Sequence, residues 1–396
     1  MSVGISIQHA STAVREDREI RTDHAGFVGL ISPTRWPRGA SPGDFTELTV
    51  DGLAAFEAHA HAALLDPGTR VAVRAFFANG GARCTVWGVC VQSEREIVDP
   101  TLVRARMVGL LERMAENDEP ALLLMPCLAW LPAEWDGSRR SGRVARVAAT
   151  EAAVLLLAHC CEVGNRFLLL DAPKDASEEL VVAWVRQLRA RAGVDPSWGA
   201  VYFPWLLRGD TALPPSGAVA GVYARTDLAN APFGVRAAPA NQEVRGFTHA
   251  AVPLSWKAGT ALLEQGVNPV LEQPGRGLAI WGARTMSADP RWAQVTARRI
   301  VAYITERVRR DAEWVVFEHQ RPELWETVAR MVRSRLDAYW SAGLLSGESR
   351  GEEYLVQCDA ELNPPAVRDA GQVHVKVMLR PTTATEFIEV ELQLGV

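Results

Sequence analysis

Lysine is almost absent from this chain of 396 residues. It occurs only at Lys174, Lys257 and Lys376, so that 39 of the 42 basic residues are arginine. Arginine carries a planar fork of several donors, which suits contacts between protein surfaces, although the bias can equally reflect genome composition. Both explanations stay open. The net charge of −5 argues against a protein dedicated to binding nucleic acid.

Long hydrophobic runs are also missing. The longest apolar stretches, Ala121–Met125 and Ala152–Ala158, are far shorter than the ~20 residues that a membrane-spanning helix needs. The first residues, MSVGISIQHAST, contain no basic segment followed by an apolar core, so no secretory signal is visible. The six cysteines form no CxxC pair, which is typical of reduced thiols in the cytosol. We expect synthesis and assembly in the cytoplasm without insertion into a membrane, and allow for later release in a particle.

No enzyme motif stands in the context that it requires. A literal GxSxG occurs at Gly347–Gly351, followed by Asp359 and His374 in the order found in hydrolases. That motif needs a strand before the serine and a helix after it, whereas here a predicted helix precedes it and a predicted strand follows. The glycines of segment 275–282 do not have the GxGxxG spacing, and no Walker sequence occurs.

Three further candidate sites have simpler explanations. Asp171 ends an apolar strand, where α/β enzymes often place an acid, but an aspartate that starts a loop before Ala-Pro explains it equally well. His59 and His61 lie two apart on a predicted helix and do not share a face, which argues against a metal pair. Cys160 and Cys161 end an apolar helix and pack as small hydrophobic residues. We therefore expect no catalytic, metal or cofactor site, and no enzyme.

The chain does contain an alternation of helices and apolar strands between residues 100 and 210. Helices predicted at Pro100–Glu116, Arg143–Val163 and Ser177–Arg191 precede the strands ALLLMP, RFLLLDAP and GAVYFPWL. Near-continuous apolar strands are typical of a sheet that is covered on both faces, and links long enough for a helix favour parallel pairing. The pattern predicts an α/β (α+β mixed) protein with a largely parallel sheet.

The regions on either side have mixed patterns. FVGLI (Phe27–Ile31) predicts a buried strand, and Leu53–Leu65 has helical character. Val71–Phe77 and the later CTVWGV are predicted as two strands joined around Asn79-Gly80-Gly81, because such residues supply the positive φ of tight turns. SGAVAGVYARTD predicts a helix that packs closely through alanine and glycine.

The segment Gly275–Phe317 has the most distinctive order of parts. A glycine-containing strand, GRGLAIWGART, is followed by a Ser-Ala-Asp-Pro turn, an arginine-rich amphipathic helix at Asp289–Asp311, and the β-type run WVVF. A second helix, Pro322–Ala342, has its own apolar stripe. Beyond it we predict the strands EEYLVQCD, QVHVKVMLR and FIEVELQLGV.

Several segments together have the order found in one known family. They are FFANGGARCTVWGV, PPSGAVAGVYARTD, AAPAN, GVNPV, GLAIWGARTMSADPRW, WVVFEHQRPELW and YLVQCD. In them the chain resembles the contractile tail sheath proteins, the outer polymer of contractile phage tails and related injection machines. The resemblance is most specific in the C-terminal third, and the Pro-Gly-Val-Tyr opening common near the family's N-terminus is missing.

The resemblance implies a structural protein with four segments. These are an N-terminal arm at 1–25, an outer α/β domain at 26–245, an inner α+β domain at 246–380, and a C-terminal β-arm at 381–396. The family forms a helical homopolymer of stacked hexameric rings around an inner tube, between a baseplate and a terminal cap, and its contraction drives the tube through a target envelope. No cofactor is implied.

The same resemblance indicates residues that would join one copy to the next. The terminal arms would pair with sheet edges of neighbouring copies through Val3, Ile5, Ile7, Ile388, Val390, Leu392 and Leu394, which alternate as strands do. A terminal strand that completes its own domain is the alternative.

A helix of the inner domain would contact the tube or a neighbouring subunit through arginine. The candidates are Arg330 and Arg333 on the second helix, and Arg298, Arg299, Arg309 and Arg310 on the first. A solvated charged face is the alternative. The rival functions are the sheath component of a two-protein type VI-like secretion apparatus and an enzyme built on the α/β region.

Overall fold

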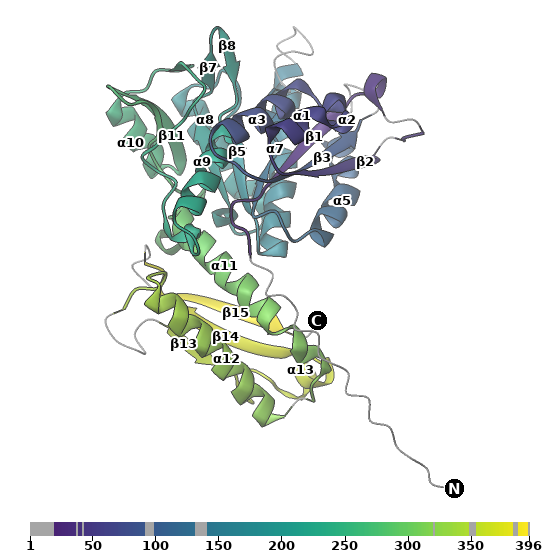
Figure 1. The fold of residues 1–396 in the computed structure, drawn as a ribbon, viewed down its shortest axis with the longest axis vertical. Helices are drawn as coiled ribbons and strands as arrows, with labels where there is room; N and C mark the ends of the chain where they lie inside the picture. The colour runs from purple at the N-terminus through teal and green to yellow at the C-terminus, as the bar shows by residue number, and fades with distance from the viewer. Residues whose placement is uncertain are drawn as a thin grey trace.

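The computed structural model describes residues 20–36, 39–41, 43–91, 99–130, 141–319, 321–347, 354–382 and 387–394. Val3, Ile5 and Ile7 of the predicted N-terminal arm lie outside these ranges. The molecule has an upper α/β part and a smaller lower part, and helix α11 (Val295–Asp311) runs from one to the other (Figure 1).

A nine-stranded sheet organises the upper part, within the described residues. In spatial order its strands are β2 (Phe45–Val50), β3 (Cys84–Cys90), β1 (Ala25–Ile31), β4 (Leu122–Leu124), β5 (Phe167–Asp171), β6 (Gly199–Phe203), β11 (Val267–Gln273), β12 (Gly277–Ile280) and β9 (Gln242–Glu243). From β3 to β11 all neighbours are parallel, and β2, β12 and β9 are antiparallel additions at the two edges. The predicted parallel sheet is confirmed.

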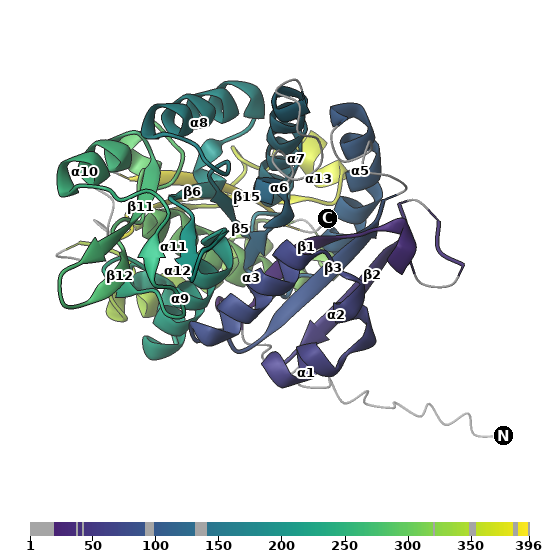
Figure 2. The same ribbon diagram turned by 90° about the horizontal axis from the view of Figure 1, so that it is seen from above.

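Helices cover both faces of this sheet (Figure 2). On one face lie α1 (Leu53–Ala58), α2 (Ala60–Leu64), α3 (Pro67–Ala78) and α9 (Ser216–Ala229). On the other lie α5 (Pro100–Glu116), α6 (Cys127–Trp130), α7 (Ser141–Val163) and α8 (Glu178–Ala192). Because both faces are buried, the central strands carry apolar residues at almost every position, as in the fully buried run of β5.

Smaller elements complete the upper part. They are α10 (Trp256–Glu264), which packs on β11, a small sheet of β7 (Leu206–Arg208), β8 (Thr211–Leu213) and β10 (His249–Ala250), and the 3-10 helices η1 (Pro33–Arg35), η2 (Pro196–Trp198), η3 (Gly234–Arg236) and η4 (Pro290–Trp292).

The predicted hairpin around Asn79 is wrong. Val71–Phe77 belongs to helix α3, which Asp66 caps by accepting a hydrogen bond from Thr69 N at 2.8 Å. Asn79 ends that helix, and its side-chain amide donates to Ala75 O at 2.9 Å. Gly80 has the positive φ that was expected of a tight turn, but it follows the end of helix α3. Strand β3 pairs with β1 in parallel and with β2 antiparallel, and neither partner is the segment Val71–Phe77.

The predicted helix SGAVAGVYARTD is confirmed as α9, and glycine explains its close packing on α3. A Cβ atom at Gly217 would lie 2.3 Å from the backbone oxygen of Ala72. The two helix backbones therefore approach more closely than any larger residue at this position would allow.

The sheet crosses the domain boundary expected between residues 245 and 246. Val267, Asn268 and Pro269 of β11 pair in parallel with β6, so the strand extends the upper sheet. By sheet membership the upper part continues through β12, and the lower part begins with α11. The apolar pattern of β11 does not indicate which of the two domains the strand belongs to.

The lower part packs two helices on a three-stranded antiparallel sheet. Its elements are α11, η5 (Glu313–Phe317), α12 (Pro322–Ser341), β13 (Tyr354–Gln357), α13 (Pro365–Asp369), β14 (Val373–Leu379) and β15 (Ile388–Leu394), with sheet order β13-β14-β15 (Figure 1). Alternate residues of β14 are buried against the helices, in a core separate from those of the upper part.

The run WVVF was predicted as β-type and forms the 3-10 helix η5, so this prediction is wrong. Val315 N donates to Ala312 O at 2.9 Å, which continues the turn that ends α11. Local hydrogen bonds thus outweigh the strand preference of two valines. None of the described helices is both long and apolar enough to cross a lipid bilayer.

Candidate functional site

Strand β15 is fully paired within its own chain. It runs antiparallel to β14 from Ile388, opposite Leu379, to Leu394, opposite Val373. Ile388, Leu392 and Leu394 are buried in the lower core and Val390 is half-buried beside it. In one chain these residues complete the three-stranded sheet of the lower part, which is the alternative that the sequence left open. Their exchange between subunits stays a prediction.

The edges of this small sheet are the strands β13 and β15. β13 and β15 each pair only with β14 among the described residues, so each has one edge without a strand neighbour. Such edges are where an added strand from another chain would pair.

The face of the sheet turned away from the helices carries charge. Lys376 Nζ lies 2.8 Å from Glu389 Oε1, and His374 Nδ1 lies 3.2 Å from Glu391 Oε1. Leu355 on β13 is 53% exposed on the same face. The sheet is thus amphipathic, with an apolar side on α12 and a mostly polar side outward.

Arg298 and Arg299 of α11 are buried, so their predicted contact with a tube or a neighbour is wrong. Arg298 donates to Asp195 and to Ser197, and its guanidinium lies 4.5 Å from the centroid of the Trp198 ring. Arg299 Nη1 donates to Asp227 Oδ1 at 3.1 Å. The arginine-rich face of α11 contacts the upper part, while its apolar face packs in the lower core. The spacing of residues in a helix indicates an apolar and a charged face, but it does not indicate that both faces are buried against the rest of the protein.

Arg309 and Arg310 near the end of α11 share the buried acid Glu306. Arg309 Nε donates to Glu306 Oε2 at 3.0 Å, and Arg310 Nε donates to Oε1 at 2.6 Å. Arg310 also reaches Asp118 of the upper part at 2.9 Å, so it joins the two parts, whereas the Arg309 side chain is 54% exposed.

Arg330 and Arg333 lie on the exposed face of α12. Arg333 Nη2 donates to the backbone oxygen of Val356 at 3.2 Å. The apolar stripe predicted for the opposite face is confirmed as buried: Trp325, Val328, Val332, Leu336 and Tyr339. These two arginines stay accessible to another molecule, and their contact with a tube or neighbour stays a prediction.

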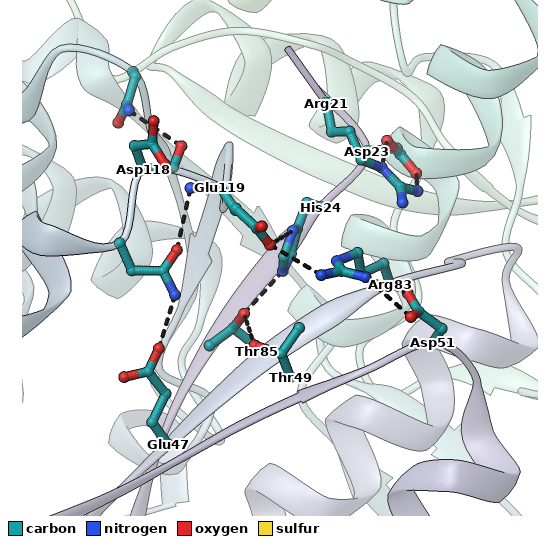
Figure 3. Close-up of polar contacts among 12 residues, drawn as sticks. Arg21, Asp23, His24, Glu47, Thr49, Asp51, Arg83, Thr85, Asp118 and Glu119 are labelled. Atoms are coloured by element: carbon teal, nitrogen blue, oxygen red, sulfur yellow. Dashed lines mark hydrogen bonds and ion pairs between the residues drawn. The ribbon is translucent and has the colours of Figure 1, made fainter. Parts of the chain in front are cut away.

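A polar network at the amino ends of the parallel strands was not predicted (Figure 3). The imidazole Nε2 of His24 lies 2.9 Å from Thr85 Oγ1, and Nδ1 lies 3.6 Å from Glu119 Oε2. Arg83 donates to Asp51 at 2.9 Å and to Glu119 at 3.2 Å. Burial lowers the pKa of His24 to about 4, so the ring is neutral at neutral pH. The network connects β1 and β3 with the segment that leads into β4.

The residues weighed as enzyme candidates do not come together. Asp171 accepts hydrogen bonds from Ser216 N at 2.7 Å and Ser216 Oγ at 2.5 Å, and so holds the start of α9. Burial raises its pKa to about 7. His374 contacts Glu391, and Asp359 accepts from Gln357 at 3.0 Å. Ser349 of the GxSxG sequence lies outside the described residues.

The histidines, cysteines and acids of the described part of the chain form no cluster of three or more that could hold a metal ion. His59 Nδ1 accepts a hydrogen bond from the backbone amide of His61 at 3.3 Å, which caps α2. Local capping therefore accounts for this histidine pair.

Comparison with protein families gives two adjoining matches. A model of the phage tail sheath protein central domain matches residues 146–286, and a model of the phage tail sheath C-terminal domain matches residues 287–395. The border between them falls after β12 and before η4, where the upper sheet ends. Together the two matches cover well over half of the chain.

Two curated relatives agree with these matches. A tail sheath protein of Vibrio phage KVP40 is 26% identical over 179 residues, which is 44% of this chain and 26% of the relative. A prophage major tail sheath protein of Pseudomonas aeruginosa strain UCBPP-PA14 is 26% identical over 212 residues, 52% of each chain. The matched segments thus span about a quarter of the Vibrio phage protein and about half of the Pseudomonas protein.

A solved structure has the same fold over nearly its whole length. It is the helical sheath of the anti-feeding prophage in the contracted state, with a TM-score of 0.69, 24% sequence identity, and 98% of both chains covered. The likeness extends over both the α/β part and the smaller part.

Proposed function

Because the chain belongs to the phage tail sheath family, we propose that it is the structural subunit of a contractile sheath. The observation that carries this proposal is the presence, in order and side by side, of the family's central and C-terminal domains over residues 146–395. The subunits would form stacked hexameric rings around an inner tube, between a baseplate and a terminal cap. Contraction would drive the tube through a target envelope.

Subunits would be joined by strands added to the edges of the inner sheet. The alternating residues Val3, Ile5 and Ile7 suit a strand that leaves one copy and pairs with an edge on another. Each main-chain hydrogen bond contributes only about 1 kcal/mol net, so a single arm holds weakly. A lattice in which every copy gives and receives an arm gains strength from the number of linked contacts.

The contraction itself would repack whole subunits. Ion pairs of Arg298, Arg299 and Arg310 hold α11 against the upper part, which favours movement of the subunit as one body. Flexible connections at the arms would absorb the change in angle between copies. Burial of surface between subunits would supply the free energy, without a nucleotide or cofactor.

A polar contact with the tube would come from α12. Arg330 and Arg333 lie on its exposed face, and Arg309 on α11 is also accessible. Exposed charges give modest, salt-sensitive attraction, which suits a contact that contraction must release. The subunit would be made and assembled in the cytoplasm and leave it only within a tail or tail-like particle.

Negative-stain microscopy of the purified chain tests polymerisation, and deletion of residues 1–19 tests the N-terminal arm. The full chain is expected to form striated tubes, whereas the shortened chain is expected to fold with the same Tm and stay dispersed. Normal tubes from the shortened chain would overturn the proposed arm exchange. Dispersed full-length monomers under all conditions would count against the sheath function itself.

The C-terminal strand needs a different test, because removing it would expose the lower core. Lys376 and Glu391 pair across β14 and β15 on the exposed face, so the double variant Lys376→Cys/Glu391→Cys can form a disulfide there. If β15 is exchanged in the assembled sheath, oxidation yields chains linked to one another. Only intramolecular bonds in the assembled sheath, as in the dilute monomer, would show that β15 stays in its own subunit.

A further inference from the structure

A cavity of about 220 Å³ lies where the upper part meets α11. We call it the junction chamber. Its walls come from the segment Ile20–Thr22, from residues at the amino ends of β4 and β5, and from one side of α11. The chamber therefore lies between the two parts that the ion pairs of α11 connect.

Arginine dominates the lining of the junction chamber. Of the described residues, six arginines line it: Arg21, Arg83, Arg166, Arg298, Arg299 and Arg310. The acids of the lining are Asp118, Glu119 and Glu306, and all three already accept hydrogen bonds or ion pairs from arginine. Among the described residues, positive charge thus exceeds negative charge in the lining, and the three carboxylates are paired with Arg83 or Arg310 of the same lining.

Arg166 differs from the other five arginines of the lining. Each of the other five forms an ion pair with a carboxylate, at Asp23, Asp51, Asp195, Asp227 or Glu306. Arg166 is completely buried, yet among the described residues its hydrogen-bond partners are only His159 Nε2, at 2.7 Å from Nη1, and the backbone oxygen of Asn117. Its Nε has no hydrogen-bond partner in the described part of the chain.

Neither partner neutralises Arg166. Burial and the adjacent Arg166 charge lower the pKa of His159 to about 4, so this ring is neutral at neutral pH. Burial also lowers the pKa of Arg166 to about 10, which leaves the guanidinium protonated. Asp118 and Glu306 oppose this lowering from a distance, but both carboxylates are paired with Arg310. A buried charge without a directly paired counter-charge is costly, and a bound anion would reduce that cost.

We propose that the junction chamber binds a small oxyanion of the phosphate class, held by Arg166. The guanidinium fork matches the oxygens of a phosphate, and the free Nε of Arg166 is a donor without a competing acceptor. Arg298 of α11 lines the same chamber, and its buried Nε likewise has no hydrogen-bond partner within the ranges that the structure describes. An anion between Arg166 and Arg298 bridges the upper part to α11 and stiffens the junction. This inference does not depend on polymerisation.

Thermal unfolding of the full chain in inorganic phosphate tests the proposal. At constant ionic strength adjusted with sodium chloride, phosphate is expected to raise the Tm in a saturable way, because a ligand that binds only the folded state stabilises it. Isothermal titration calorimetry of the same protein is expected to give a single site per chain. A Tm that follows ionic strength alone, with no heat of phosphate binding, would overturn the proposal.

Two variants separate the site from nonspecific stabilisation. Arg166→Met removes the buried charge, so in phosphate-free buffer it is expected to fold with an unchanged or higher Tm, and to lose the rise with phosphate. Arg330→Gln removes an exposed arginine of α12 and is expected to keep the full rise. An Arg166→Met protein that still responds to phosphate as the unaltered chain does would show that Arg166 does not hold the anion. If Arg166→Met fails to fold, Arg166→Gln with the calorimetric readout decides the same question.

Discussion

Arg299 of α11 and Asp227 of α9 form an ion pair inside the protein, with side chains that are 4% and 2% exposed. Arg299 also donates to the backbone oxygen of Thr22 at 3.0 Å, where the described chain begins. One guanidinium thus connects the upper part, the helix that leads to the lower part, and the base of the N-terminal segment.

Replacing Asp227 by asparagine is expected to destabilise the protein strongly. The change leaves Arg299 charged and buried without its counter-charge, a loss typically of about 3–5 kcal/mol. Urea unfolding measures it. Glu57→Gln is the control, because it removes the exposed pair between Arg74 and Glu57, which contributes at most about 1 kcal/mol. Equal losses of unfolding free energy in both variants would show that the buried ion pair contributes no more to stability than the exposed one.

Asp171 is expected to make stability fall as pH rises. Its folded-state pKa of about 7 lies above the usual value for aspartate, so between about pH 4 and pH 7 the folded state holds a proton that the unfolded state has lost. Asp171→Asn cannot ionise and should therefore gain stability relative to the unaltered chain across this range. The measurement is the difference in unfolding free energy between the two proteins at pH 5 and pH 8. A difference that does not change with pH would contradict the assignment.

Gly217→Ala is expected to force α3 and α9 apart. The new Cβ would lie 2.3 Å from the backbone oxygen of Ala72, and overpacking of this kind costs about 1–3 kcal/mol. Gly109→Ala on α5 is the matched control, since nothing lies within 4 Å of its Cβ position. Alanine favours a helix over glycine by about 0.5–1 kcal/mol, so the control should be more stable. Chemical denaturation measures the free energy of unfolding, which should fall in Gly217→Ala and rise in Gly109→Ala.

The double variant Arg330→Glu/Arg333→Glu is expected to impair assembly on a tube without changing the fold. Both side chains are exposed on α12, and surface substitutions usually alter stability by less than about 0.5 kcal/mol. Co-assembly with purified tube protein, scored by microscopy, is the measurement. Arg74→Glu/Arg104→Glu on the upper part makes the same change of charge and should assemble normally. Sheaths of ordinary length from the first variant would exclude α12 as the tube contact.

Local patterns were enough for the elements that carry a strong periodicity. The apolar runs of β4, β5 and β6, each preceded by an amphipathic helix, predicted the parallel sheet. The stripe from Trp325 to Tyr339 predicted the buried face of α12. The patterns gave wrong predictions at Asn79 and at Val315. Asn79 ends a helix and Val315 lies in a 3-10 helix, so helical hydrogen bonds are formed where strand pairing was expected.

The sequence by itself determined the alternation of helices and strands, the apolar faces that must be covered, and the segments shared with the sheath family, because these depend on residue type and spacing along the chain. Only the tertiary structure decided that the basic face of α11 is buried, that β11 joins the upper sheet, and that Arg166 and Arg298 line one chamber. Those outcomes depend on which surfaces distant segments present to one another. The spacing of charged residues along a helix is the same whether water or a second domain covers them.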